Sequence, residues 1–255
     1  MFGEYKDADD FKEKAGYTID DVWYPRVTKI VTIKAKPALY FYYAAAKSYK
    51  AAQEATEQSA KEGTMIHEAV EGLLLDKNPE IPAQIAPAVA SFQQFFEKNN
   101  IQVTPDLVER RIVNYDHRYA GTVDAIALIG GKLGVLDIKT SQAIYRDYSL
   151  QTSAYMDALK SQFKNLQTRW ILKIDQVQFC EKCGARRRIK GGNEKIKIDP
   201  RSALMRTCDH VWGPLLGDIE LKEFPYWQDD FQAFLGAKRL WEWENDFWLK
   251  KVGYL

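Results

Sequence analysis

The sequence predicts an α/β domain with a central mixed β-sheet flanked by helices. Stretches whose apolar residues recur at helical spacing alternate with shorter stretches rich in β-branched residues. Two of the strand candidates meet at Gly130-Gly131, a dipeptide typical of a two-residue hairpin turn. The chain has 255 residues, of which 46% are hydrophobic, enough for one large core. Because no repeat or low-complexity linker divides it, we expect a single domain over residues 1–255.

The first hundred residues predict mainly helices. Residues 23–30 have the character of a loop that enters a short ordered segment, and residues 38–60 are rich in good helix formers. Gly63-Thr64 then predicts the start of another helix, with Thr64 as its N-cap. Residues 84–98 carry apolar side chains on one helical face and predict a third helix.

The remainder predicts the sheet and its later helices. Strands are expected at Leu107–Tyr115, Gly121–Ile129, Lys132–Lys139, Thr168–Phe179 and Asp218–Phe224. A helix with Ser149 as its N-cap is expected over Ser149–Phe163. Aromatic residues recur every three or four positions from Trp227 to Trp248, which predicts one or two closing helices.

Composition and charge exclude some classes of protein. No apolar run approaches the ~20 residues of a membrane helix, and the acidic, polar N-terminus is unlike a secretory signal. Three cysteines fit poorly with a secreted disulfide scaffold, so we expect a cytoplasmic protein. A net charge of +1, taken alone, argues against a strongly basic nucleic-acid binder.

Two carboxylates are predicted to face each other across the hairpin. If Gly130 and Gly131 form the turn, paired residue numbers add up to 261, as do those of Asp124 and Asp137. Directly opposed positions have Cβ atoms ~4.5–5.5 Å apart. Lys139 shares the face of Asp137, while Leu136 and Ile138 face the core.

Opposed like charges destabilise a sheet unless something compensates them. A divalent cation does so, because Mg²⁺ is held by one or two carboxylates together with water and substrate phosphate. A lysine beside such a site can hold a phosphate. The alternative is a solvated hairpin face with an ordinary salt bridge.

The residues around this pair resemble the PD-(D/E)XK nuclease superfamily, and most closely its RecB-like exonuclease branch. The similarity covers roughly residues 23–175 and rests on five short motifs in the family's order. They are Gly63-Thr64-Met65-Ile66-His67, Glu109, Gly121-Thr122-Val123-Asp124, Asp137-Ile138-Lys139-Thr140-Ser141 and Gln151-Thr152-Ser153-Ala154-Tyr155. Tyr24-Pro25-Arg26-Val27-Thr28 is similar to the start of many members, although Arg26 replaces the usual serine. The resemblance implies a restriction-endonuclease-like core.

The resemblance also implies roles for individual residues. His67, Asp124, Asp137 and the Ile138 carbonyl would hold a catalytic Mg²⁺ or Mn²⁺, with Glu109 beside them or bound through water. Lys139 would activate the attacking water and steady charge on the phosphate. Gln151 and Tyr155, four apart on one helical face, would contact the scissile backbone or orient the lysine.

Simpler interpretations exist for the same residues. His67 is alternatively an ordinary core histidine, and Gln151 and Tyr155 are alternatively plain helix surface. Glu68 follows His67 on a different side of the helix, so we treat it as peripheral.

All three cysteines fall in a late segment that we interpret as a zinc-knuckle-like insertion over residues 178–212. Cys180 and Cys183 form a Cys-x₂-Cys pair, and Cys208 with His210 completes a four-ligand set suited to structural Zn²⁺. An unmetallated reduced loop and an iron–sulfur cluster are the alternatives.

The charge is unevenly distributed. Residues 180–210 hold nine basic and four acidic residues, a net charge of +5, which leaves −4 for the rest of the chain. Arg186-Arg187-Arg188 and the lysines that follow them are either a surface that tracks phosphates or a solvated hairpin.

We therefore expect a metal-dependent deoxyribonuclease, an exonuclease in which a metal-bound water attacks the phosphodiester. Its expected partners are DNA that is single-stranded or has free ends and a protein of DNA repair or recombination, or of phage DNA processing. The alternatives are a non-catalytic nucleic-acid-binding module with a degenerate nuclease core and zinc ribbon, and an interaction protein that docks through its knuckle and Trp-rich tail.

Overall fold

The computed structural model describes residues 5–198 and 208–255. Its first elements are α1 (Ala8–Ala15), β1 (Gly16–Ile19), β2 (Val22–Pro25), α2 (Val27–Val31), α3 (Pro37–Ala45), α4 (Tyr49–Leu74) and α5 (Ala86–Lys98). The elements that follow are β3 (Gln102–Asn114), β4 (Tyr119–Ile129), β5 (Lys132–Lys139), α6 (Tyr148–Leu159), β6 (Leu166–Phe179), β7 (Arg186–Lys190), β8 (Asn193–Lys197), β9 (Leu216–Glu223), α7 (Gln228–Glu244) and α8 (Asp246–Lys251).

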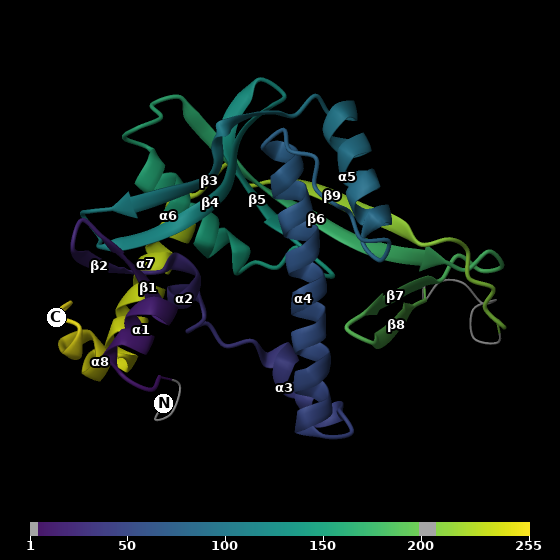
Figure 1. The fold of residues 1–255 in the computed structure, drawn as a ribbon, viewed down its shortest axis with the longest axis horizontal. Helices are drawn as coiled ribbons and strands as arrows, with labels where there is room; N and C mark the ends of the chain where they lie inside the picture. The colour runs from purple at the N-terminus through teal and green to yellow at the C-terminus, as the bar shows by residue number, and fades with distance from the viewer. Residues whose placement is uncertain (1–4, 199–207) are drawn as a thin grey trace.

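The central sheet is mixed, as expected. Strands β3, β4 and β5 form an antiparallel meander, β6 pairs with β5 in parallel, and β9 pairs with β6 in antiparallel fashion. The end of β6 runs beyond this sheet and pairs with β7, which forms a hairpin with β8. Figure 1 shows the β7–β8 hairpin at one end of the molecule.

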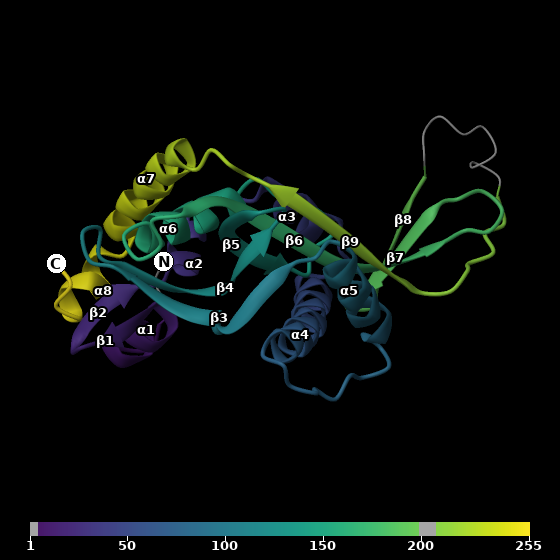
Figure 2. The same cartoon turned by 90° about the horizontal axis from the view of Figure 1, so that it is seen from above.

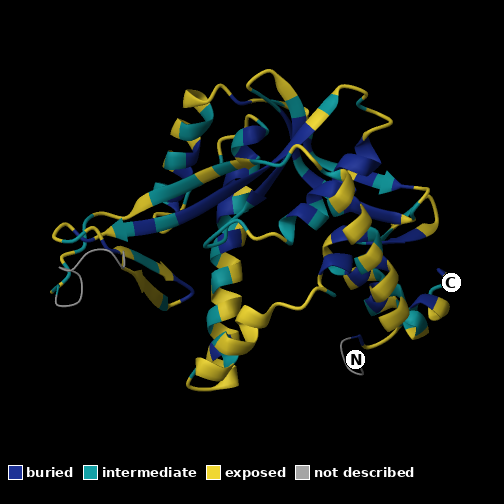
Figure 3. Ribbon diagram, turned by 180° about the vertical axis from the view of Figure 1, so that it is seen from behind, coloured by how far each residue is buried: buried dark blue, intermediate teal, exposed yellow. Residues whose placement is uncertain are grey.

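Helices cover both faces of the sheet and create two cores. Figure 2 shows α4 and α5 on one side and α6 and α7 on the other. One core joins α1, α2, α6, α7 and α8 to the sheet, with Phe11, Tyr155 and Phe234 among its buried side chains. The other joins α4 and α5 to it through residues such as Ile66, Phe92 and Leu136. Figure 3 shows the buried residues concentrated along the sheet.

The hairpin register predicted from Gly130-Gly131 is confirmed. Both glycines have positive φ, 58° and 79°, as a type I′ turn requires. The recorded pairs run from Ile129↔Lys132 to Ala125↔Leu136, and all add up to 261. Leu136 and Ile138 are buried in the core under α4 and α5, as expected.

Two predicted helix starts are wrong. Thr64 is not an N-cap, because α4 is one 26-residue helix that runs through it. Gly63 marks a close approach instead, since a Cβ there would lie 2.5 Å from Thr140 Oγ1. Ser149 is not an N-cap either: α6 begins one residue earlier, Asp147 precedes it, and Ser149 is buried.

The N-terminal 36 residues hold more structure than the sequence predicted. The expected loop over residues 23–30 is the end of β2 followed by α2. Residues 1–4, which include part of the acidic N-terminus, lie outside the described residues, as do Arg201 and Arg206 of the insertion. Within the described part of the chain, no helix has both the length and the apolar character needed to cross a bilayer.

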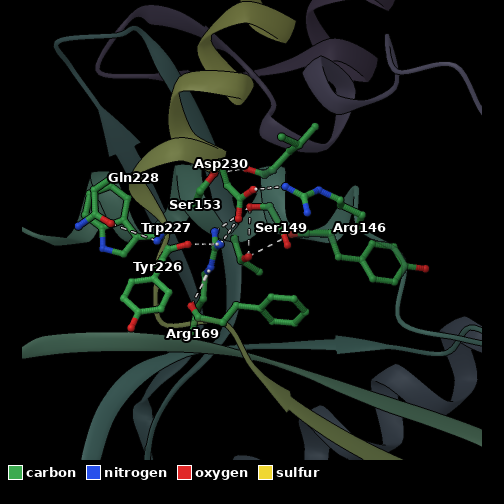
Figure 4. A network of polar contacts seen from close by, with 12 residues as sticks. Arg146, Ser149, Ser153, Arg169, Tyr226, Trp227, Gln228 and Asp230 are labelled. Atoms are coloured by element: carbon green, nitrogen blue, oxygen red, sulfur yellow. Dashed lines mark hydrogen bonds and ion pairs between the residues drawn. The ribbon is translucent and has the colours of Figure 1, made fainter.

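A fully buried arginine joins the sheet to two helices (Figure 4). Arg169 of β6 donates hydrogen bonds to the carbonyls of Ser149 in α6, at 2.8 Å, and Tyr226 before α7, at 3.2 Å. It also pairs with the carboxylate of Asp230 in α7. Arg146, whose side chain is 90% exposed, lies 3.6 Å from the other oxygen of Asp230. Arg169 therefore fixes the start of α6 relative to the sheet.

We predict that Arg169→Met lowers the free energy of unfolding by about 3 kcal/mol, because it leaves the half-buried carboxylate of Asp230 and several carbonyls without their donor. Urea unfolding measures the change. The matched control is Arg146→Met, which removes an exposed partner of the same aspartate and should cost less than about 1 kcal/mol. Equal losses in the two variants would contradict a special role for the buried arginine.

Candidate metal and carboxylate site

Three side chains of types that can bind a metal converge from α4, β3 and β4. His67 Nε2 lies 3.3 Å from Asp124 Oδ2. Glu109 completes the group, whose ligand atoms all lie within 4.8 Å of one another. The three residues span 58 positions of the sequence, and the fold alone brings them together.

An irregularity in the sheet makes this meeting possible. Glu109 has a left-handed backbone, with φ of 48°, and the recorded pairing passes from Val108↔Ala125 to Arg110↔Val123. Val108 belongs to the core under α4, whereas Ile112, four residues on, belongs to the other core. Regular alternation would keep these two residues on one face. The alternation of side chains between the two faces is therefore interrupted at Glu109 and Asp124. His67 of α4 lies next to this interruption.

Asp137 is held by a separate set of contacts. Its side chain is fully buried, and its Oδ2 lies 2.7 Å from Lys139 Nζ. Its Oδ1 accepts a hydrogen bond of 2.9 Å from Gln151 Nε2, which also lies 3.0 Å from the Tyr155 hydroxyl. Lys139 retains 19% side-chain exposure. The lysine is thus oriented by the aspartate and still reaches the surface.

A backbone contact joins the two groups. The Ile138 N–H donates a 2.6 Å hydrogen bond to Asp124 Oδ2. The structure therefore brings together all the residues predicted for the catalytic site. The group within ligand distance is His67, Glu109 and Asp124, while Asp137 is engaged by Lys139 and Gln151.

The pKa shifts reveal crowding of negative charge. Burial, followed by the charges of Asp124 and Glu71, raises the pKa of Glu109 to about 7. Burial raises the pKa of Asp137 to about 6 despite the nearby ammonium of Lys139. The hydrogen bond to Asp124 raises the pKa of His67, which favours the protonated imidazole beside these carboxylates.

This donor set fits a hard divalent cation. Two carboxylates and an imidazole are ligands that Mn²⁺ accepts, and Mg²⁺ favours the carboxylate oxygens. The raised pKa of Glu109 follows from burial and from the neighbouring carboxylates of Asp124 and Glu71, whose negative charge a cation would offset. A cation bound there would offset the negative charge of Asp124 and Glu109.

Sequence reasoning overlooked Tyr148. Its ring centroid lies 5.3 Å from Lys139 Nζ, a cation–π contact from the first residue of α6. The spacing of Tyr148, Gln151 and Tyr155 at three and four residues would have placed all three on one helical face.

A second cluster lies at the base of the cysteine insertion. Cys180 Sγ is 3.9 Å from Cys208 Sγ, and Cys183 Sγ is 3.3 Å from His210 Nδ1. The four ligand atoms lie within 4.8 Å of one another, so this Cys₃His group could bind a metal such as zinc. Cys180 also forms an isolated β-bridge with Trp212, which closes the insertion where it leaves the sheet.

The arginines of the insertion are engaged within the protein. Arg186 lies 2.6 Å from an oxygen of Asp218, and Arg188 pairs with Asp175. Arg187 lies 2.6 Å from an oxygen of Glu194 on the facing strand. These ion pairs offset much of the hairpin's positive charge and favour its structural interpretation over the phosphate-tracking one.

Comparisons with known proteins leave the family open. No model of a protein family matches the chain, and no curated protein has significant sequence similarity to it.

We predict that Glu109→Gln raises Tm by about 3 °C at pH 8 in EDTA, because it removes a charge crowded by Asp124 and Glu71. The folded-state pKa is raised, so this gain is full above about pH 7 and disappears towards pH 4.5, where both states are protonated. Scanning fluorimetry across pH measures it. Added Mn²⁺ should stabilise the wild type more than the variant.

Glu68→Gln is the matched control, because Glu68 is exposed and adjoins His67 in sequence. It should change neither Tm nor the response to Mn²⁺. A Tm gain in Glu109→Gln that is constant across pH would contradict the electrostatic cause.

We also predict that the purified protein contains about one zinc atom per chain and that His210→Ala lowers this content severalfold, because one of four ligands is lost. Elemental analysis gives the stoichiometry. His117→Ala is the control, since His117 packs against Phe231 and should leave the zinc content unchanged. Zinc-free wild-type protein with four reactive ligands would contradict the assignment.

Proposed function

We propose that this chain is a metal-dependent deoxyribonuclease of the RecB-like branch of the PD-(D/E)XK superfamily, with a restriction-endonuclease-like core, acting from DNA ends. The observation that carries the proposal is the convergence of five separate sequence motifs on one site. Their residues are His67, Glu109, Asp124, Asp137, Lys139, Gln151 and Tyr155. The meander β3–β5, followed by a parallel β6 across α6, supports the same core.

The three-ligand group is where a Mg²⁺ or Mn²⁺ ion would bind, and the family resemblance adds Asp137 and the Ile138 carbonyl as further ligands. Such an ion, when bound, supplies charge neutralisation for a phosphodiester and lowers the pKa of water. His67 must bind through its unprotonated nitrogen, so metal binding releases a proton.

Lys139 has the properties needed to act on the phosphate directly. Burial alone would lower the pKa of its ammonium, but the carboxylates of Asp137 and Asp124 outweigh burial and raise it. The lysine is therefore charged, held by Asp137 and open to the surface on one side. We propose that it binds a non-bridging oxygen of the scissile phosphate and stabilises the charge that grows there.

Gln151 and Tyr155 act on the phosphate only indirectly, through Asp137 and Lys139. Gln151 donates to Asp137, and so fixes the carboxylate that orients the lysine. Tyr155 is almost fully buried, so in this proposal it positions Gln151 rather than touching DNA.

We predict that Lys139→Met lowers the rate of DNA hydrolysis at least about 100-fold, because removal of one preorganised donor to developing charge has that effect. The assay uses end-labelled single- and double-stranded DNA with Mg²⁺ or Mn²⁺. Lys132→Met is the matched control, because Lys132 lies at the opposite end of β5 in an exposed pair with Glu223. It should keep wild-type activity.

The position of the label also tests the mode of action. Release of mononucleotides or short products from one labelled end supports an exonuclease and gives its polarity. DNA binding without hydrolysis by folded, metal-loaded protein would overturn the proposal and support a non-catalytic module.

A further inference from the structure

Three strongly exposed aromatic side chains lie in or next to α3 in the sequence. Tyr40 is 65% exposed, Phe41 76% and Tyr49, at the start of α4, 68%. None of the nine residues of α3 is buried. Figure 3 shows α3 and the adjoining half of α4 mostly in yellow, the colour of exposed residues. Aromatic side chains that a core does not use are a mark of a binding surface.

This part of the chain is also cationic. Residues 34–50 contain Lys34, Lys36, Lys47 and Lys50 and no acidic residue. The nearest acids along the chain are Asp21 and Glu54. We call residues 34–50 the aromatic–lysine segment. Its charge complements an anionic partner, and the exposed rings offer flat surfaces to it.

The segment is anchored to the rest of the protein. The Tyr42 hydroxyl donates to the Ala52 carbonyl at 3.3 Å and receives a 3.1 Å hydrogen bond from Asn193 of β8. The rings of Tyr43 and Tyr49 lie 5.3 Å apart with an angle of 31° between their planes. Tyr42 and Tyr43 thus hold α3 against α4, while Tyr40 and Phe41 remain exposed.

One end of the segment adjoins the candidate catalytic site. Lys36 Nζ lies 3.6 Å from a carboxylate oxygen of Asp147. Asp147 directly precedes Tyr148, whose ring contacts the Lys139 ammonium. Along α4, Tyr49 and His67 are separated by 18 residues, or ~27 Å at 1.5 Å per residue. That length corresponds to about eight stacked nucleotides, and fewer if the strand is extended.

We propose that the aromatic–lysine segment binds single-stranded nucleic acid, with bases stacked on Tyr40 and Phe41 and phosphates held by the lysines, and so leads a strand towards the site at Lys139. Proteins that bind single strands combine exposed aromatic rings with a cationic track in this way. The choice of ligand rests on the proposed nuclease function. An anionic membrane surface would also attract lysines and aromatic residues, but it offers no reason for the segment to adjoin the site.

The test measures the binding of a labelled oligo-dT of about 20 nucleotides by fluorescence anisotropy in EDTA, so that catalysis plays no part. The double variant Tyr40→Ala/Phe41→Ala should weaken binding about 30-fold or more, because two stacking surfaces are lost. Tyr226→Ala is the matched control, since Tyr226 is 87% exposed and lies before α7. It should bind as the wild type does. Circular dichroism checks that each variant is folded.

Charge substitutions give a second readout. Lys34→Ala/Lys47→Ala should flatten the dependence of log affinity on log salt by about 0.7 for each phosphate that the variant no longer neutralises. Unchanged single-strand affinity in the aromatic double variant would overturn the inference. The inference would also be overturned if the aromatic double variant kept its affinity for oligo-dT but lost binding to phosphatidylserine vesicles. That result would assign the segment to a membrane surface.

The outcomes separate this inference from the proposed function. If the wild type hydrolyses no DNA with Mg²⁺ or Mn²⁺ but binds single strands through Tyr40 and Phe41, the nuclease proposal fails and the binding surface stands. If hydrolysis occurs and the aromatic double variant binds normally, only the surface is rejected.

Discussion

The candidate site depends on the crowding of three carboxylates, of which that of Asp137 is fully buried and that of Asp124 is 13% exposed. Glu109, Asp124 and Asp137 come from three adjacent strands, and their mutual repulsion is a cost that the fold must offset. Two side chains do so: His67, whose pKa is raised by its contact with Asp124, and Lys139, whose ammonium lies beside Asp137. The balance is incomplete, since the pKa of Glu109 remains raised to about 7. Carboxylates that a rigid sheet holds close together, with raised pKa values, are typical of functional sites.

The backbone around Glu109 serves the same arrangement. A non-glycine residue with φ of 48° is unfavourable, and such conformations persist where the surrounding structure enforces them. Here the sheet changes face, so that Asp124 reaches α4 while Asp137, on the next strand, contacts α6. Arg169 supports the second contact from behind, because its hydrogen bond to the Ser149 carbonyl fixes the turn of α6 that carries Gln151. The site is therefore built from both cores, each of which positions one carboxylate.

The sequence predicted what local rules determine and missed what depends on distant partners. Gly130-Gly131 fixed the turn and the strand register as far as Ala125↔Leu136, because turn type and strand pairing are local. The recorded pairing ends one residue short of Asp124 and Asp137, and these two carboxylates contact helices on opposite sides of the sheet rather than facing each other as predicted. Gly63 led to the wrong prediction of a helix start at Thr64. In a sequence, a glycine at a helix boundary cannot be distinguished from a glycine that allows a close contact, here with Thr140. The sequence also did not predict that Glu109, rather than Asp137, lies within ligand distance of His67 and Asp124. This arrangement follows from the irregular backbone at Glu109.

The structure shows which of the basic residues behind the net charge of +1 are paired within the fold. In the sequence, the positive excess lies in the insertion, where Arg186-Arg187-Arg188 fitted either a phosphate-tracking surface or a solvated hairpin. These arginines instead pair with carboxylates, two of which, Asp175 and Asp218, come from β6 and β9 outside the insertion. Their charge joins the hairpin to the sheet, and much of it is neutralised within the fold. In residues 34–50, Lys36 pairs with Asp147 and Lys50 with Glu54, whereas the exposed Lys34 and Lys47 have no ion pair among the described residues. Local pairing, rather than the count of basic residues, decides which surface can attract a polyanion.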